Sequence, residues 1–345
     1  MGRRPDVARS SWPIALIDLA GLAGHLGTAL VRVPFRRPWR RAGSLPRNLG
    51  VAVTRETIRS FMGYASSLQI DEFRSVELVL DSLCGAVLSP VVRSMKVTEE
   101  ECEVGGVPGV WYRPVSGPVA GTILYLHGGG YVGTSPRMYA VFVAGLCRST
   151  GCAVFVADMR LAPEFPFPAG LEDAVLVVDA LLAEGIDPGR LFVAGDSSGG
   201  GLAASLLYAM ESVESAPIAG VFLFSPELDL LLDQPSVADN ATADILPWNI
   251  PTAAYLHGRD PTSSVLSGLD QDVKGWPPTF VYFGSDEMLR DSIRTFIAHL
   301  EEAEVETVAH EEEGMFHVFP ILMPWAEASH RVYHQIGEFV STHLP

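Results

Sequence analysis

The sequence predicts an α/β protein in which a mostly parallel central sheet is covered by helices on both faces. Short apolar runs, typical of strands buried on both faces, alternate with helical patterns from residue 122 to residue 340. In addition, 48% of the 345 residues are apolar and 19% are charged. This composition suits a globular chain with a large core.

The residues before this alternation are expected to be helical. Residues 54–92 place apolar side chains at helical spacing, as at Ile58, Phe61 and Met62. Because they precede the first strands, they are expected to form a cap. We therefore predict three parts, namely an N-terminal extension over 1–50, a helical cap over 51–93 and a main domain over 94–345.

The main domain is predicted to begin with a hairpin, in which Val97–Val104 and Val107–Arg113 pair around Gly105-Gly106. The later strands are expected over 122–126, 153–157, 191–194, 221–224, 279–283 and 305–309. The helices of this domain are expected over 171–182, 200–210, 292–300 and 326–340. The stretch 234–278 is rich in Asp, Pro and Trp and interrupts the alternation. It is predicted to form a second excursion over the active face.

Charge and cysteine content limit the classes of partner. The net charge of −17 argues against nucleic acid, because phosphate binding requires the opposite sign. The four cysteines form no C-x-x-C pair and no zinc-type spacing. Cys147 and Cys152 have apolar neighbours, which favours unpaired buried thiols, whereas a Cys84–Cys102 bridge stays open. We expect a cytoplasmic protein without a metal site.

The first 50 residues are basic in an otherwise acidic chain. They hold nine arginines against Asp6 and Asp18, a net charge of about +7 that leaves about −24 for the remainder. Asp18 and His25 interrupt the apolar stretch 12–33, so neither a spanning helix nor a secretory signal is expected. Two interpretations stay open. Residues 12–47 contact an anionic membrane surface peripherally, or they fold over the substrate cleft with their arginines solvated or paired with the acidic body.

The segment Gly195-Asp196-Ser197-Ser198-Gly199 is expected to present a nucleophilic serine. Residues 190–194 before it predict a buried strand, and the small, Ala/Leu-rich residues 200–210 after it predict a helix. A G-x-S-x-G pentapeptide in this context is typical of a nucleophile elbow. The free N–H groups at the start of the helix would face a developing oxyanion. A glycine-rich strand–helix turn of a Rossmann-like fold is the structural alternative.

A second glycine-rich segment, His127-Gly128-Gly129-Gly130, follows the strand that ends at Leu126. The N–H groups of Gly128 and Gly129, together with that of Ser198, are predicted to form an oxyanion hole. A phosphate-binding loop is the alternative, but no P-loop lysine or G-x-G-x-x-G pattern follows. His127 itself is expected to hold the loop by hydrogen bonds.

A nucleophilic serine needs a base, and the base needs a group that orients it. Asp286 follows the strand predicted over 279–283, and His317 follows the last predicted strand. Both therefore lie at the same sheet edge as Ser197, where the three can converge. Glu287 and Asp291 are rival carboxylates, for which a solvated role at a helix start is expected.

Four ordered blocks carry a resemblance to a known family. They are Tyr125–Tyr131 (YLHGGGY), Arg160–Glu164 (RLAPE), Gly195–Gly200 (GDSSGG), and Asp286–Met288 with His317. From about residue 97 to residue 345 the chain resembles the hormone-sensitive-lipase-type (bacterial family IV) esterases of the α/β-hydrolase superfamily, and more loosely their actinobacterial members. The resemblance implies an α/β-hydrolase catalytic domain with Ser197 as nucleophile, Asp286 as acid, His317 as base, and Gly128 and Gly129 as oxyanion donors.

The sequence therefore predicts a serine carboxylic-ester hydrolase for short- to medium-chain acyl esters of small molecules or lipids, without a metal or organic cofactor. Tyr131, Trp248 and Phe316 are expected to line its pocket. A membrane-associated lipid hydrolase or an acyltransferase using the same triad is the alternative. A non-catalytic ligand receptor is less well supported, because such proteins usually lack a triad member. A homodimer stays open.

Overall fold

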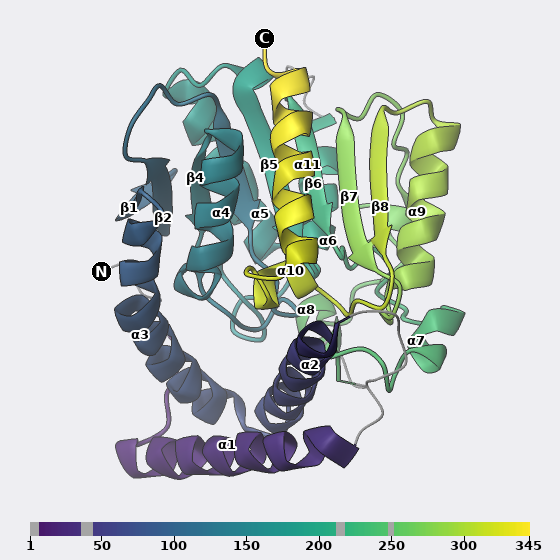
Figure 1. Cartoon of the computed structure of the whole chain (residues 1–345). Helices are drawn as coiled ribbons and strands as arrows, with labels where there is room; N and C mark the ends of the chain where they lie inside the picture. Colours follow the sequence, from purple (N-terminus) through teal and green to yellow (C-terminus); the bar gives the residue numbers. More distant parts are fainter. Residues whose placement is uncertain (1–6, 36–43, 212–217, 248–251) are drawn as a thin grey trace.

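An eight-stranded sheet crosses the centre of the molecule in the computed structural model, which describes residues 7–35, 44–211, 218–247 and 252–345 (Figure 1). The strand order is β1-β2-β4-β3-β5-β6-β7-β8. The first two pairings, β1 with β2 and β2 with β4, are antiparallel, and all the others are parallel. The strands are β1 (Val97–Val104), β2 (Val107–Pro114), β3 (Thr122–Leu126), β4 (Ala153–Ala157), β5 (Leu191–Asp196), β6 (Gly220–Phe224), β7 (Thr279–Gly284) and β8 (Thr307–Glu312).

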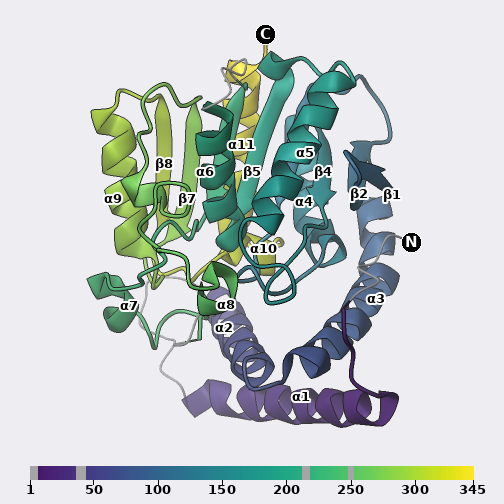
Figure 2. The same cartoon turned by 180° about the vertical axis from the view of Figure 1, so that it is seen from behind.

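Helices cover both faces of this sheet, as Figures 1 and 2 show from opposite sides. One face carries α4 (Ala140–Thr150) and α11 (Glu327–His343), and the other carries α5 (Ala169–Ala183), α6 (Ser198–Glu211) and α9 (Arg290–Glu302). Each face has its own apolar core, and every residue of β3, β4 and β5 is buried. The predicted fold class is confirmed.

The predicted strands and helices of the main domain are present, with ends that differ by up to three residues. Helix α4 was not predicted. Eight of its eleven residues are buried, because it packs against α11 and α3 as well as the sheet. A helix that is apolar on nearly every side has no polar stripe, so its periodicity is weak.

The N-terminal part forms three long helices, α1 (Trp12–Arg32), α2 (Leu45–Ala65) and α3 (Ile70–Ser94), with η1 (Val33–Phe35) after α1. The boundary expected at residue 50 falls inside α2. Ser44 begins that helix earlier, because its side chain accepts from Arg47 N–H at 3.4 Å and Pro46 favours the first turn. Figure 1 shows α2 and α3 reaching beyond the carboxyl ends of the parallel strands, with α1 lying across them.

The remaining elements are short. The interrupted stretch after β6 contains α7 (Pro235–Asp239), α8 (Thr252–Leu256) and η4 (Gly268–Asp270). The others are η2 (Pro136–Tyr139), η3 (Pro188–Arg190) and α10 (Phe319–Leu322). All four cysteines are free, so Cys84 and Cys102 form no bridge, and Cys147 and Cys152 are buried thiols as expected.

Candidate active site

The turn from β5 into α6 places Ser197 at the carboxyl edge of the sheet. Ser197 adopts φ +52°, a left-handed conformation that non-glycine residues rarely occupy. The neighbouring chain leaves no space for larger residues. A Cβ on Gly195 would lie 2.3 Å from the carbonyl oxygen of Gly199, and one on Gly199 would lie 2.1 Å from that of Leu126. The expected strand–turn–helix context is therefore present, with glycine where the backbone approaches itself.

His317 reaches Ser197 from the loop between β8 and α10. Its Nε2 lies 2.8 Å from Ser197 Oγ, and both side chains are buried. Two contacts hold the loop. The N–H of His317 donates to Asp244 Oδ1 at 2.9 Å, and the N–H of Val318, at φ +47°, donates to Ser225 Oγ at 3.0 Å.

The carboxylate beside His317 belongs to Glu287, and the expectation for Asp286 is wrong. Glu287 Oε2 lies 3.2 Å from His317 Nδ1, while its Oε1 accepts from Ser225 Oγ at 2.7 Å and from Gly284 N–H. The side chain of Asp286 instead accepts from Arg55 of α2 at 3.3 Å.

The solvated helix-start role expected for Glu287 is also wrong, because α9 begins at Arg290 and Glu287 is fully buried. Asp291 does lie in the first turn of α9, where it accepts from Ser236 N–H at 2.9 Å and pairs with Arg290.

The charges around His317 favour its protonated form. Burial opposes the imidazolium, but the hydrogen bond and charge of Glu287, with the nearby Asp244 and Asp196, outweigh it and raise the pKa of His317 above its ordinary value. Burial raises the pKa of Glu287 as well, and the bonds from His317 and Ser225 partly offset this. Two groups in such contact titrate as a pair.

The glycine-rich loop after β3 approaches the same edge, but Gly128 faces away from an oxyanion position. Its N–H donates to Asp196 Oδ1 at 3.0 Å, so the prediction of Gly128 as an oxyanion donor is wrong. Tyr125 OH donates to the same oxygen at 2.8 Å. Burial raises the pKa of Asp196 to about 6. Gly129 and Gly130, at φ +121° and +63°, form the half-buried tip of the loop.

His127 holds this loop, as the sequence predicts. Its Nδ1 lies 2.9 Å from Thr134 Oγ1 and 3.0 Å from Gly128 O, so the ring ties the start of the loop to its end.

The chain is similar to known proteins in sequence and in fold. Residues 123–321 match the family model described as alpha/beta hydrolase fold. An acetyl-hydrolase of Streptomyces hygroscopicus is 34% identical over 246 residues, which cover 69% of this chain and 81% of the relative. A putative acetyl-hydrolase, LipR, of Mycobacterium tuberculosis is 30% identical over 270 residues, 75% of this chain and 85% of the relative. A crystal structure of an esterase from the bacterial hormone-sensitive lipase family superposes with a TM-score of 0.76 at 30% identity, over 88% of this chain and 100% of that chain.

The chain belongs to the hormone-sensitive-lipase-type esterases of the α/β-hydrolase fold. It is therefore an ester-hydrolysing enzyme, and the resemblance predicted from the four sequence blocks is confirmed.

The three pocket residues predicted from the sequence of this esterase have different surroundings. Tyr131 stacks on Tyr255 of α8, with ring centroids 3.7 Å apart and planes at 7°. Phe316 is fully buried in the core on the α4 and α11 side, with the Arg55 guanidinium 5.6 Å from its ring centroid. Trp248 lies outside the described residues. A small cavity adjoins the elbow, lined by His127, Tyr131, Met159, Arg160, Leu161, Gly170, Ser198, Gly199, Leu202 and Tyr255.

Two arginines support the glycine-rich loop through ion pairs and hydrogen bonds. Arg74 of α3 donates to Glu164 at 2.7 and 2.9 Å, to Ala162 O at 2.9 Å and also to Val132 O. Arg160 in turn donates to Asp173 of α5 at 2.9 Å. The block Arg160–Glu164 therefore attaches the loop to the cap and to α5.

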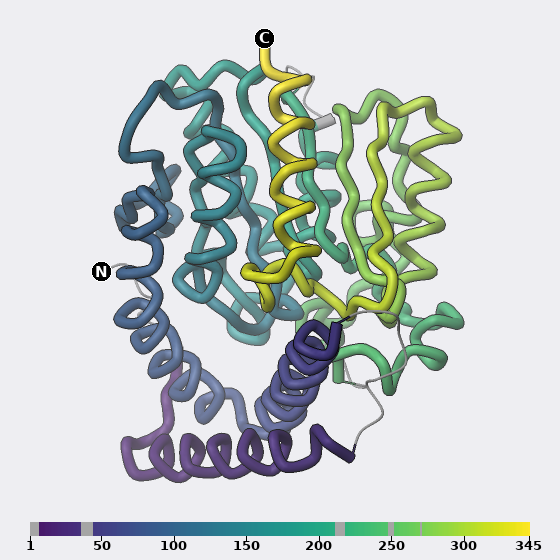
Figure 3. Tube along the Cα trace, in the orientation of Figure 1, coloured from purple at the N-terminus to yellow at the C-terminus, as the bar shows by residue number. Residues whose placement is uncertain are grey.

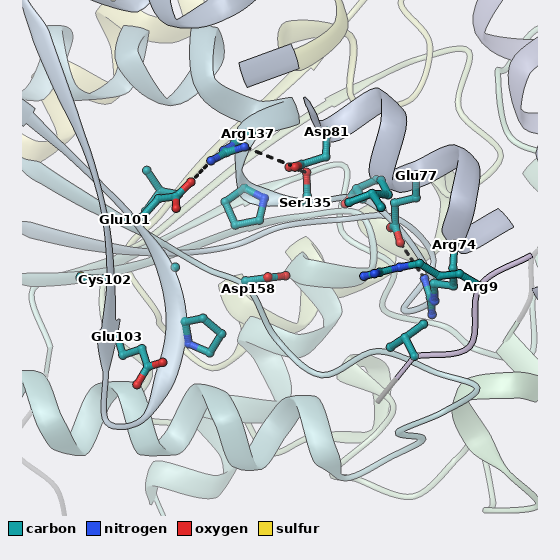
Figure 4. A pocket seen from close by; sticks show the side chains of 17 residues that line it. Arg9, Arg74, Glu77, Asp81, Glu101, Cys102, Glu103, Ser135, Arg137 and Asp158 are labelled. Carbon is teal, nitrogen blue, oxygen red and sulfur yellow. Dashed lines mark hydrogen bonds and ion pairs between the residues drawn. The ribbon is translucent and has the colours of Figure 1, made fainter. Parts of the chain in front are cut away.

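A second cavity, of about 700 Å³, lies apart from the serine, between α3, the β1–β2 hairpin and η2 (Figure 4). Arg137 crosses it and pairs with Asp81 at 3.5 Å and with Glu101. These ion pairs join α3 to the hairpin.

Sequence reasoning missed Asp244 and Ser225. Asp244 accepts from the N–H groups of His317 and Met288, and thus joins the loop that carries His317 to the segment that carries Glu287. It lies in the irregular stretch after β6, where no periodicity indicates which residues point inward. Ser225 has a partial signal, because it directly follows a predicted strand at the same edge as Ser197.

Substitution of Gly199 by alanine is expected to prevent stable folding of the elbow. The new methyl group would overlap the backbone carbonyls of Leu126 and His127, which cannot move without breaking the sheet. Gly63 of α2 is the matched control, because a Cβ there meets nothing within 4 Å, and alanine should stabilise the helix by about 0.5–1 kcal/mol. Urea unfolding of both variants measures the difference. A Gly199→Ala protein as stable as wild type would contradict the described turn.

Proposed function

We propose that this esterase is a serine carboxylic-ester hydrolase whose triad is Ser197, His317 and Glu287. Ser197 Oγ attacks the ester carbonyl while His317 Nε2 takes its proton, and the same proton then passes to the leaving alcohol. Glu287 holds Nδ1–H of the imidazole and stabilises the imidazolium. Water repeats the sequence and releases the acid. The contacts of 2.8 and 3.2 Å that link the three side chains carry this proposal.

The oxyanion donors in this proposal are the N–H groups of Gly129, Gly130 and Ser198. Gly130 replaces Gly128, whose N–H is taken by Asp196. Within the described part of the chain, no hydrogen bond of these three N–H groups is found, so they are available to a substrate oxygen. One such donor is typically worth about 3–4 kcal/mol of transition-state stabilisation.

The substrates in this proposal are esters with short to medium acyl chains. The cavity beside Ser198 has a volume of only about 10 Å³ and is lined in part by the stacked Tyr131 and Tyr255, so it offers no room for a long acyl chain at that point. An acyltransferase or a lipid hydrolase would use the same three side chains, and competition between water and alcohols separates these cases. The alternative of a receptor without activity does not agree with membership of a family of ester-hydrolysing enzymes.

The expected peripheral membrane contact through residues 12–47 is part of the same proposal, with the body of the enzyme in the cytoplasm. The apolar outer side of α1 supports it. The alternative expectation, in which the arginines pair with the acidic body, is met at Arg47, whose side chain lies 3.6 Å from Glu312. The two are compatible.

Hydrolysis of p-nitrophenyl esters with acyl chains of two to sixteen carbons tests the proposed function. We expect rates to peak among the short chains and to fall by about 10⁴-fold or more in Ser197→Ala, because the nucleophile is lost. Full activity in that variant would overturn the assignment of Ser197. Faster hydrolysis of long, emulsified triglycerides than of the four-carbon ester would overturn the proposed acyl length.

Substitution of each of the neighbouring carboxylates, Glu287 and Asp286, distinguishes the two candidates for the acid. Glu287→Gln keeps the size of the side chain but presents a neutral amide to His317 Nδ1, so kcat should fall by about 10²–10⁴-fold. Asp286→Asn, the matched control, should lower kcat by less than about tenfold, because its side chain faces Arg55. The reverse order of effects would restore Asp286 as the acid.

Activity should also fall as the pH drops, because His317 must be neutral to accept the serine proton. Since its pKa is raised, the acid limb of kcat/KM should have its midpoint above the ordinary histidine value of about 6.5. The measurement is a pH profile with the four-carbon ester, with circular dichroism at each pH to verify folding. A profile that stays flat down to about pH 4.5 would contradict His317 as the base.

A further inference from the structure

We propose that α1 lies in the plane of an anionic bilayer surface, with its outer side against lipid and its inner side on the cap. The partner of the membrane contact is thus an anionic bilayer, and the contacting element is the outer side of α1. Only the substrate class inferred from this orientation rests on the proposed ester hydrolysis.

The side of α1 that faces the protein holds the one carboxylate of the helix. Its buried side is formed by Ala15, Asp18, Leu22 and Ala29, so the one carboxylate of the helix points inward. Helix α2 holds this side through two hydrogen bonds, from Tyr64 OH to Asp18 O at 2.9 Å and from Ser60 Oγ to His25 O at 3.0 Å.

The outer side of α1 and the turn after it are apolar. Trp12, Leu16, Ile17 and Val31 are 68, 60, 70 and 70% exposed, and Phe35, just beyond the helix, is 84% exposed. A surface helix of a globular protein normally turns such side chains inward and its charges outward. A contiguous exposed apolar patch of this kind marks contact with a membrane or a partner.

Charge favours a bilayer over a second copy of the chain. Both flanks of α1 are basic in the sequence, with three arginines in residues 3–9 and five in residues 32–41. Two copies of α1 packed against each other, parallel or antiparallel, would oppose these like charges. An anionic lipid surface attracts both ends of the helix at once.

An in-plane helix fits better than a spanning one. Among the described residues, Trp12–Phe35 and Ile70–Ser94 are long and apolar enough to cross a membrane. The sequence analysis expected no spanning helix here, because Asp18 and His25 interrupt the apolar stretch. Trp12–Phe35 nevertheless has a mean hydropathy of 1.7. However, crossing would remove α1 from α2 and bury Asp18 in lipid. In α3, the Arg74–Glu164 ion pair already holds the helix to the body.

The orientation has a consequence for substrates. Helix α1 lies beyond the carboxyl edge of the sheet, the edge that carries Ser197 (Figures 1 and 2). Contact through α1 therefore turns the active-site end of the molecule toward the bilayer. If the proposed ester hydrolysis holds, esters that partition into membranes are the substrate class that this placement favours.

Flotation of the full-length protein with phosphatidylcholine vesicles, with and without phosphatidylglycerol, tests the contact. We expect wild type to float with the anionic vesicles, and less with added salt or without phosphatidylglycerol. The double variant Leu16→Glu and Ile17→Glu should lose at least about tenfold in bound fraction, because it places two carboxylates in the lipid-facing patch. Both positions are exposed, so folding should be unaffected.

The matched control is the double variant Val115→Glu and Val119→Glu. These residues are 60 and 44% exposed, and they lie in the loop before β3, at the opposite end of the sheet from α1. The control should float like wild type, and all three proteins should hydrolyse the four-carbon p-nitrophenyl ester in solution at equal rates. If wild type does not hydrolyse this ester, the proposed function is overturned, but the flotation result still stands.

Four outcomes would overturn the membrane proposal. The first two are that wild type does not float, and that the Leu16/Ile17 variant floats as well as wild type. The third is that bound protein resists extraction by alkaline carbonate, which would indicate a spanning helix. The fourth is that light scattering finds a wild-type dimer, which the same variant converts to a monomer, without any vesicle binding; this would assign the patch to a second copy.

Discussion

The close approach of the elbow to the end of β3 is the constraint on which the site depends. Strands β3 and β5 pair in register, Leu126 opposite Gly195, so the two glycine-rich turns leave the sheet side by side. Gly199 then lies against the carbonyls of Leu126 and His127, a distance that only a residue without Cβ allows. Asp196 completes the junction, because it precedes the serine and accepts from the N–H of Gly128. Asp196 thus links the turn that carries Ser197 to the glycine-rich loop after β3.

The burial of Glu287, the partner of His317, explains why its carboxylate accepts several hydrogen bonds. A carboxylate with no exposed surface is costly unless its oxygens accept hydrogen bonds. Glu287 accepts from His317 in the loop after β8, from Ser225 in the loop after β6, and from Gly284 at the end of β7. Asp286 is only one residue away, but it points toward α2 and pairs with Arg55. At this edge of the sheet, the carboxylate of Glu287 therefore faces His317, and the carboxylate of Asp286 faces the cap.

Sequence patterns predicted the sheet, the elbow and His317 because each has a local cause. Buried parallel strands are continuous apolar runs, and the elbow requires glycine at fixed offsets. The acid could not be chosen in the same way, since Asp286 and Glu287 both follow β7. Which one turns inward depends on Ser225 and on Arg55, and Arg55 is 231 residues from Asp286 in the chain. The same limit applies to Gly128, whose N–H is taken by a side chain on another strand. Contacts between distant segments are absent from any local pattern.

The cap does more than cover the site, because its arginines contact the loops that hold the reacting side chains. Arg55 binds Asp286, Arg59 donates to the carbonyls of Ala241 and Asp244, and Arg74 donates to Val132 beside the glycine-rich loop. Asp244 then bonds the N–H of His317. Arg59 of α2 and His317 are therefore linked through Asp244 by two hydrogen bonds.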